Sequence, residues 1–196
     1  MMKIGLTGSI GMGKTTVAKM FAARGIPVFD ADAAVHQLYA RGGAAVEPVG
    51  AAFPGTVKDG AVDRAALSAA VVGKPAELKK LETIVHPLVG RLREDFLRMA
   101  EAGGADMAVL EIQMLLEGSS AKQLDAIVVV SAPETVQRER ALARPGMTEQ
   151  KLAGILSNQM PDAEKRARAD YVIDTGVSLA ETDAQVASLI ETLRKT

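Results

Sequence analysis

The stretch KIGLTGSIGMGKTT, residues 3–16, decides the fold of this chain. It contains Gly8-x-x-x-x-Gly13-Lys14-Thr15, the complete phosphate-binding loop pattern, between a short apolar run and a helical run. Such a loop points backbone N–H groups at an anion, and the helix that follows turns the positive end of its dipole toward the same anion. Lys14 is placed to reach the β and γ phosphates, and the Thr15 hydroxyl to hold Mg²⁺. The alternative is a glycine-rich turn that only joins strand to helix, but every fixed position is filled and both flanks fit. The pattern therefore predicts that the chain binds ATP or GTP.

The composition is typical of a globular cytoplasmic enzyme. The 196 residues suit one domain, 48% of them are hydrophobic, and the formal net charge is −1. This small charge and the aromatic content of 3% argue against a nucleic-acid partner. Because the chain has no cysteine, we expect no disulfide, thiolate metal site or cysteine nucleophile. We also expect no signal peptide and no membrane partner, because no run approaches the roughly 20 apolar residues that a bilayer requires.

Short β-rich runs alternate with longer helical patterns, which predicts an α/β fold with a parallel sheet. The expected strands cover residues 3–7, 26–29, 107–112, 126–130 and 171–174. The helix after the loop is expected to stop at Gly25. Two later helices are expected to begin at capping boxes, Ser131-x-x-Glu134 and Ser178-x-x-Glu181, whose side chains cap each other's backbone donors.

The long interval between residues 29 and 107 predicts a helical insertion, because a crossover between parallel strands needs only about a dozen residues. Asp63 is expected to cap a helix within it. Residues 75–102 are expected to form a long helix that proline bends or breaks at His86-Pro87. Such an insertion is a natural place for a second substrate.

A second helical segment, residues 138–168, is strongly basic. A segment that closes over a triphosphate needs arginine, because guanidinium groups stabilise charge on a transferring phosphoryl group. We therefore expect Arg140 and Arg144 to contact phosphate, with pairing to a surface glutamate as the alternative for either. For three other cations we expect an ordinary solvated helix face: Lys151, Lys165 and Arg166.

Two carboxylates, Asp30 and Asp32, follow the second expected strand, at the sheet edge where open α/β folds bind ligands. A hydroxyl nucleophile needs a proton acceptor, so an aspartate there is the expected general base. Either aspartate can instead cap the next helix, and that alternative is stronger for Asp30. Neither His36 nor His86 has a cysteine or second histidine at ligand spacing, so no transition-metal site is expected. Both histidines are interpreted as packing or surface residues.

Six segments together resemble the dephospho-coenzyme A kinase family, in order and over nearly the whole chain. They are GLTGSIGMGKTT at 5–16, FDAD at 29–32, HP at 86–87, LEIQMLLEG at 110–118, RERALARPGM at 138–147 and ADYVIDTG at 169–176. The resemblance implies transfer of the γ-phosphoryl group of ATP, with Mg²⁺, to the 3′-hydroxyl of the ribose of dephospho-coenzyme A, the last step of coenzyme A synthesis. It also implies a three-layer P-loop kinase fold with a five-stranded parallel sheet, in a single domain over residues 1–196. Within that domain it implies a helical acceptor-binding insertion at about 33–103 and an arginine-bearing lid at about 138–168.

The resemblance assigns roles to particular residues. Lys14, Asp32 and Arg140 are implied as catalytic, and Asp32, His86 and Glu111 as contacts of the acceptor. The expected ATP-binding residues are Gly8, Gly11, Met12, Gly13, Lys14, Thr15, Thr16, Arg144, Thr175 and Gly176. Thr15 is expected to hold Mg²⁺, with help from Asp32 or Glu111. For residues 174–176 an ordinary turn is the alternative, and a monomer is expected.

The chain departs from the family where the strand end, usually DIPLLFE, reads EIQMLLE at residues 111–117. Glu111 keeps the negative charge of the family's aspartate on a side chain that is one methylene longer. Gln113 replaces the family's proline, so the backbone N–H that proline lacks is present here. We expect activity to survive in weakened form. Two other functions stay open: a related kinase acting on a nucleoside monophosphate or a sugar, and a nucleotide-controlled switch. A guanine-specific switch would carry an Asn-Lys-x-Asp element, which the sequence lacks.

Overall fold

The computed structural model describes residues 1–118 and 120–195 and divides the chain into two compact units. The first unit combines Met1–Phe29 with Ala100–Thr196, and the second is Asp30–Met99. The second unit thus covers the interval between the second and third expected strands, where the sequence predicts an insertion. In the described part of the chain, no helix is both long enough and apolar enough to cross a membrane.

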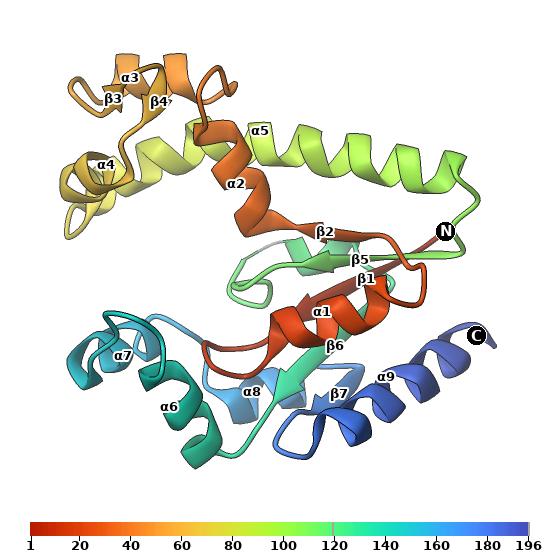
Figure 1. Cartoon of the computed structure of the whole chain (residues 1–196). Coiled ribbons are helices and arrows are strands. Elements are labelled where there is room, and N and C mark those ends of the chain that lie inside the picture. Colours follow the sequence, from red (N-terminus) through yellow and green to blue (C-terminus); the bar gives the residue numbers. More distant parts are fainter. Residues whose placement is uncertain (119, 196) are drawn as a thin grey trace. The chain divides into compact units, whose positions relative to one another are not determined.

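The first unit is built on a five-stranded parallel sheet with strand order β2-β5-β1-β6-β7 (Figure 1). Its strands are β1 (Met2–Thr7), β2 (Val28–Asp30), β5 (Met107–Glu111), β6 (Ala126–Ser131) and β7 (Tyr171–Asp174). The central strand β1 pairs with β5 on one side and β6 on the other, so that Ile4 lies opposite Val109 and Ala126. The α/β class, the parallel sheet and all five expected strands are confirmed.

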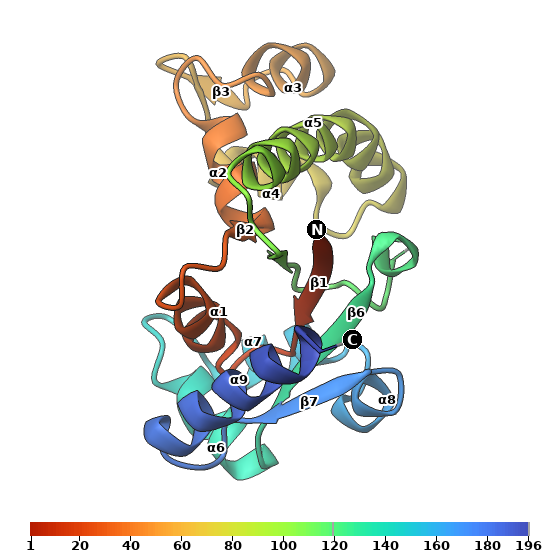
Figure 2. The same cartoon turned by 90° about the vertical axis from the view of Figure 1, so that its right-hand side faces the viewer.

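The strands read as continuous apolar runs because helices cover both faces of the sheet. Every residue of β5 is buried. Figure 2 shows two of the covering helices, α8 (Asp162–Ala167) and α9 (Leu179–Leu193), on opposite sides of β7. The main core joins the sheet to helices α1 (Lys14–Ala22) and α9, through residues that include Ile4, Val109, Val128, Val17, Phe21, Val186 and Ile190.

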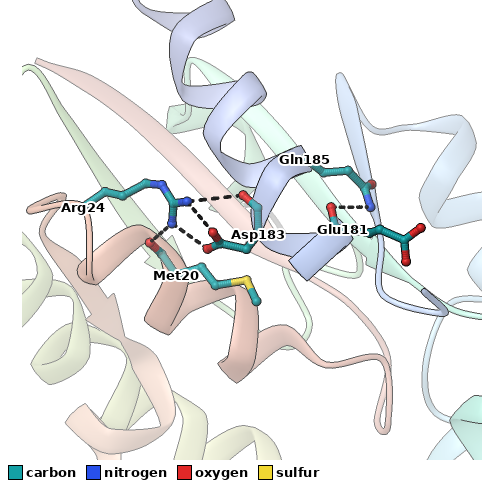
Figure 3. A network of polar contacts seen from close by, with 5 residues as sticks. All are labelled: Met20, Arg24, Glu181, Asp183 and Gln185. Atoms are coloured by element: carbon teal, nitrogen blue, oxygen red, sulfur yellow. Dashed lines mark hydrogen bonds and ion pairs between the residues drawn. The ribbon is translucent and has the colours of Figure 1, made fainter. Parts of the chain in front are cut away.

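Polar contacts fasten α9 to the end of α1 (Figure 3). Arg24 donates hydrogen bonds to both carboxylate oxygens of Asp183, each at 2.7 Å, and a third to the Met20 carbonyl at 3.0 Å. The α9 capping box expected at Ser178 and Glu181 is confirmed, with the Ser178 side chain accepting from the Glu181 N–H. The first helix ends at Ala22, close to the expected stop at Gly25.

Three helices form the basic segment: α6 (Glu134–Leu142), α7 (Glu149–Leu156) and α8. The capping box expected at Ser131 is wrong. Ser131 is the last residue of β6 and pairs with Asp174 of β7, and its hydroxyl donates to Asp162 Oδ2 at 2.7 Å. Helix α6 therefore begins after Pro133, without a side-chain cap. Between β5 and β6 the chain also forms a short 3₁₀ helix, η1 (Ser120–Gln123).

The second unit has its own apolar core. It contains helices α2 (Ala31–Tyr39), α3 (Val46–Ala52), α4 (Arg64–Val71) and α5 (Pro75–Ala102), with a small antiparallel pair of strands, β3 (Val57–Lys58) and β4 (Ala61–Val62). Leu38, Val49, Phe53, Leu67 and Leu88 are among the buried residues of that core. Asp63 caps α4 as expected, by accepting hydrogen bonds from Ala65 N and Ala66 N.

Residues 75–102 form one helix as expected. Of the bend or break expected at Pro87, the break is wrong, because α5 continues through the proline. Proline removes one backbone donor from the helix interior. Apolar residues on both sides of it, Leu81 and Ile84 before and Leu88 and Leu92 after, pack into the core of the unit. This packing holds both halves of the helix in place, which offsets the lost hydrogen bond.

Candidate active site

Glycine is required at three positions of the phosphate loop for different reasons. Gly11 and Gly13 adopt φ angles of +80° and +83°, which side chains rarely tolerate. A Cβ at Gly8 would lie 2.8 Å from the Val130 carbonyl oxygen, and one at Gly11 would lie 2.5 Å from the Gln137 carbonyl oxygen. These three glycines therefore let the loop curl tightly against β6 and α6.

Lys14 and Thr15 converge on one buried carboxylate, that of Glu111. The Lys14 Nζ lies 2.6 Å from Glu111 Oε1, and the Thr15 hydroxyl donates to the same oxygen at 3.1 Å. Glu111 is 4% exposed and ends β5, which is the neighbour of β1 in the sheet. Parallel pairing thus carries the carboxylate to the start of α1, and the structure brings three of the predicted site residues together.

The oxygen ligands at this point fit Mg²⁺. A hard cation prefers hydroxyl and carboxylate oxygens, and Mg²⁺ is usually bound by one or two carboxylates together with substrate phosphates. Thr15 and Glu111 offer such a pair. Among residues 1–118 and 120–195 there is no cluster of three or more His, Cys, Asp or Glu side chains that could hold a metal without help from a substrate.

Arg140 binds the loop that follows β7. Its Nη1 donates to the Thr175 hydroxyl at 3.1 Å and its Nη2 to the Thr175 carbonyl at 2.7 Å. The Thr175 hydroxyl in turn donates to the Met12 carbonyl of the phosphate loop at 2.7 Å. This chain of contacts links Arg140 of α6 to the phosphate loop. Arg144 lies two residues beyond the end of α6 with an exposed side chain.

The neighbouring glycine of the β7 loop is also sterically constrained. A Cβ at Gly176 would lie 2.4 Å from Pro133 Cδ. The N–H of Gly176 donates to Asp174 Oδ1 at 2.7 Å, so residues 174–176 form a defined turn. Thr175 is 5% exposed, and its hydroxyl is engaged with the phosphate loop.

The solvated position expected for Lys165 is wrong, because its side chain is completely buried. Its Nζ lies 2.9 Å from Glu117 Oε1, and that oxygen also accepts a hydrogen bond from Met160 N at 2.9 Å. Burial raises the pKa of Glu117, but the hydrogen bonds from Lys165 and Met160 outweigh it and hold that pKa below its ordinary value. The pair ties α8 to the segment that follows Glu111.

Acid should weaken the fold through Glu117. Because its pKa is lower in the folded than in the unfolded chain, its contribution to stability is complete above the unfolded value of about 4.3. It is lost as the pH falls through that value toward the lower folded pKa. In urea titrations, Glu117→Gln should be less stable than the parent at pH 7, and the difference should shrink with acidification. Two parallel pH profiles would contradict this assignment.

Of the remaining predicted site residues, Thr16 is exposed on α1 in the first unit, and the others lie in the second unit. Asp30 Oδ1 accepts a hydrogen bond from Ala33 N at 2.9 Å, so the alternative of a helix cap is confirmed for Asp30. Asp32 lies in the first turn of α2 with an exposed side chain. His86 is exposed on α5, whereas His36 Nε2 lies 2.8 Å from Arg64 Nη1.

Comparisons with known proteins agree over nearly the whole chain. The family model described as dephospho-CoA kinase matches residues 2–181. A dephospho-CoA kinase from Novosphingobium aromaticivorans is 57% identical over 192 residues, which cover 98% of this chain and 94% of the relative. A crystal structure of a Thermus thermophilus protein matches with a TM-score of 0.87 and 34% identity, over 98% of this chain and 97% of that one. The dephospho-CoA kinase from Campylobacter jejuni shares the fold, with a TM-score of 0.73 and 21% identity over 98% and 97% of the two chains.

Proposed function

Because the chain belongs to the dephospho-CoA kinase family, we propose that it transfers the γ-phosphoryl group of ATP to the 3′-hydroxyl of the ribose of dephospho-coenzyme A. The products are coenzyme A and ADP, and the reaction is the last step of coenzyme A biosynthesis. The observation that carries the proposal at the level of the site is the convergence of Lys14 and Thr15 on Glu111 beside a complete phosphate loop. The proposed reaction uses ATP, Mg²⁺ and a small acceptor, and we propose that the protein carries it out in the cytoplasm as a monomer.

Lys14 and the loop supply most of the charge stabilisation. The loop glycines allow backbone N–H groups to cradle the phosphates, and Thr16 and the other first residues of α1 add the helix dipole. Before ATP binds, Lys14 is held by Glu111 at 2.6 Å. On binding, its ammonium group exchanges this partner for the β and γ phosphates, where it offsets the charge that develops during transfer.

Once Lys14 has moved to the phosphates, the Glu111 carboxylate is available to bind a metal ion. Thr15 and Glu111 would hold Mg²⁺, because they offer a hydroxyl and a carboxylate oxygen at one point. Bound there, the ion would supply positive charge that offsets the negative charge of the phosphates. The extra methylene of Glu111 relative to the aspartate of the family fits its reach to both Lys14 and Thr15.

The acceptor hydroxyl needs a proton acceptor, which we assign to Asp32. Its neighbour Asp30 caps α2, and the Asp32 carboxylate is exposed in the first turn of the same helix. His86, which lies on α5, is a further proposed contact of the acceptor. Arg140 and Arg144 stabilise the transferring group from the lid, and Gly176 and Thr175 line the nucleotide site.

Replacing Arg140 with alanine should lower the turnover number more than it raises the Michaelis constant for ATP. A lid arginine acts mostly on charge that develops during transfer, which affects turnover rather than ground-state binding. Steady-state kinetics at saturating acceptor would measure both constants. Arg138→Ala is the matched control on the same helix, because Arg138 instead pairs with Glu149 at 2.6 Å. An effect of Arg140→Ala confined to the Michaelis constant would assign Arg140 to ground-state binding through Thr175.

A direct assay tests the proposed reaction. Purified protein with Mg-ATP is offered dephospho-coenzyme A, AMP, CMP, gluconate or pantothenate in separate reactions, and ADP release is measured in each. We expect ADP release well above the blank with dephospho-coenzyme A and with none of the other four acceptors. Release with another acceptor would indicate a related small-molecule kinase instead. No release with any acceptor would contradict the assignment as a kinase of small molecules.

A further inference from the structure

Two buried glutamines hold the peptide groups of one residue of the phosphate loop, Ile10. Gln159 Oε1 accepts a hydrogen bond from Ile10 N at 3.2 Å, and Gln137 Nε2 donates to the Ile10 carbonyl at 2.9 Å. The glutamines are 8% and 7% exposed. The backbone fixes which end of each amide faces it, because Ile10 N–H can only donate and its carbonyl can only accept.

Both glutamines come from the lid side of the unit. Gln137 lies on α6, and Gln159 lies between α7 and α8. The side chain of Ile10 is buried in a small apolar cluster with Ala141 of α6 and Leu152 of α7. Ile10 is therefore anchored to residues 137–159 through its side chain and through both of its peptide groups.

The direction of these contacts matters for an anion site. A phosphate loop must turn N–H groups toward the phosphates and keep carbonyl oxygens away, because a carbonyl dipole repels an anion. The Ile10 carbonyl is engaged by Gln137, and the Met12 carbonyl is engaged by Thr175 at 2.7 Å. Side-chain donors thus hold two carbonyl groups of the loop, and each of these groups is satisfied without water.

We propose that Gln137 and Gln159 are positioning residues for ATP: they fix the Ile10 peptide groups and so preset the phosphate loop before the nucleotide arrives. They act through Ile10 and do not touch the nucleotide. The inference rests on the proposed function to the extent that this loop binds ATP. The lid helices, on this basis, contribute to nucleotide affinity from behind the loop as well as through their arginines.

The test compares two kinds of substitution at each glutamine. Gln137→Met and Gln159→Met keep the side-chain length and remove the amide. Gln137→Glu and Gln159→Glu both add a negative charge near the loop. The carboxylate at 159 can still accept the hydrogen bond from the Ile10 N–H, whereas an ionised carboxylate at 137 cannot donate to the Ile10 carbonyl. The ATP dissociation constant is measured by calorimetry without any acceptor, together with the turnover number and the melting midpoint.

Each methionine variant should bind ATP about tenfold more weakly, the effect expected when one buried peptide group loses its partner. Gln137→Glu should bind ATP about tenfold more weakly than Gln159→Glu. Thr56→Val is the control for a purely structural loss, because it removes a buried hydrogen bond from Thr56 to the Phe53 carbonyl, at 2.7 Å, in the second unit. It should lower the melting midpoint and leave the ATP dissociation constant unchanged.

Two results would overturn the proposal. The first is a set of methionine variants that melt earlier, as Thr56→Val does, but bind ATP like the parent. The second is an equal ATP affinity of the two glutamate variants. Binding is measured without acceptor, so a parent protein that binds ATP but does not phosphorylate dephospho-coenzyme A would contradict the proposed function alone. A parent protein that does not bind ATP would contradict both.

Discussion

Lys14→Ala should lower the turnover number by about 10²–10³-fold, the loss typical when one preorganised group that stabilises developing charge is removed. In the absence of nucleotide the Lys14 ammonium lies against Glu111, and with ATP bound we expect it on the phosphates. The lost stabilisation applies to the transition state, so turnover should fall more than ATP affinity. The rate of ADP release at saturating substrate concentrations measures the turnover number.

Lys14→Ala should also be less stable to unfolding than the parent protein. Glu111 is 4% exposed, so removing Lys14 leaves a buried carboxylate without its cation. The double variant Lys14→Ala/Glu111→Gln should melt at a higher temperature than the single variant while staying inactive. Lys19→Ala is the matched control, because Lys19 is an exposed cation on the same helix. A folded Lys14→Ala protein with turnover near that of the parent would mean that phosphate is bound elsewhere.

The elements that could be predicted are those with a local or periodic signature. The phosphate loop needs glycine at set positions, so its spacing alone identifies it. The structure explains both positions: Gly13 has a positive φ angle, and a Cβ at Gly8 would lie 2.8 Å from the Val130 carbonyl oxygen. The strands of a parallel sheet are apolar on both faces, which is why a run such as residues 107–111 could be recognised.

The elements that could not be predicted depend on partners far along the chain. Lys165 lies in a charged helical segment, where a lysine is usually solvated. Nothing near it in the sequence indicates that Glu117 lies against it. Gln137 and Gln159 have no sequence signature, because their partner is the backbone of Ile10. Ser131 matches a local capping pattern, but pairing with β7 extends the strand through it. For Lys165 and Ser131, a tertiary contact overrides a correct local rule.

Pro87 makes the same point in the second unit. Proline in a helix interior costs about 3 kcal/mol or more in isolation, which favours a helix end at that position. Burial of an apolar side chain such as Leu88 contributes roughly 1.5–3 kcal/mol, and several such residues flank the proline on α5. The helix therefore continues because packing on both sides together exceeds the local cost.

Asp32→Asn should lower the turnover number by about 10²–10⁴-fold, the range typical for loss of a general base, with ATP affinity little changed. Asparagine keeps the size of the side chain but cannot accept the proton of the acceptor hydroxyl.

Three measurements on Asp32→Asn separate the roles that this carboxylate can have: the single-turnover rate, ATP affinity and the melting midpoint. A role as general base lowers the first alone. A metal ligand would instead lower ATP affinity in the presence of Mg²⁺ while single-turnover chemistry stays normal, and a helix cap would lower only the melting midpoint. Asp30→Asn is the matched control, because Asp30 is the residue that caps α2 and asparagine caps helices about as well as aspartate. Since Asp30 already makes the capping bond to Ala33 N, a loss of activity at Asp32 without a loss of stability would leave proton transfer as its function.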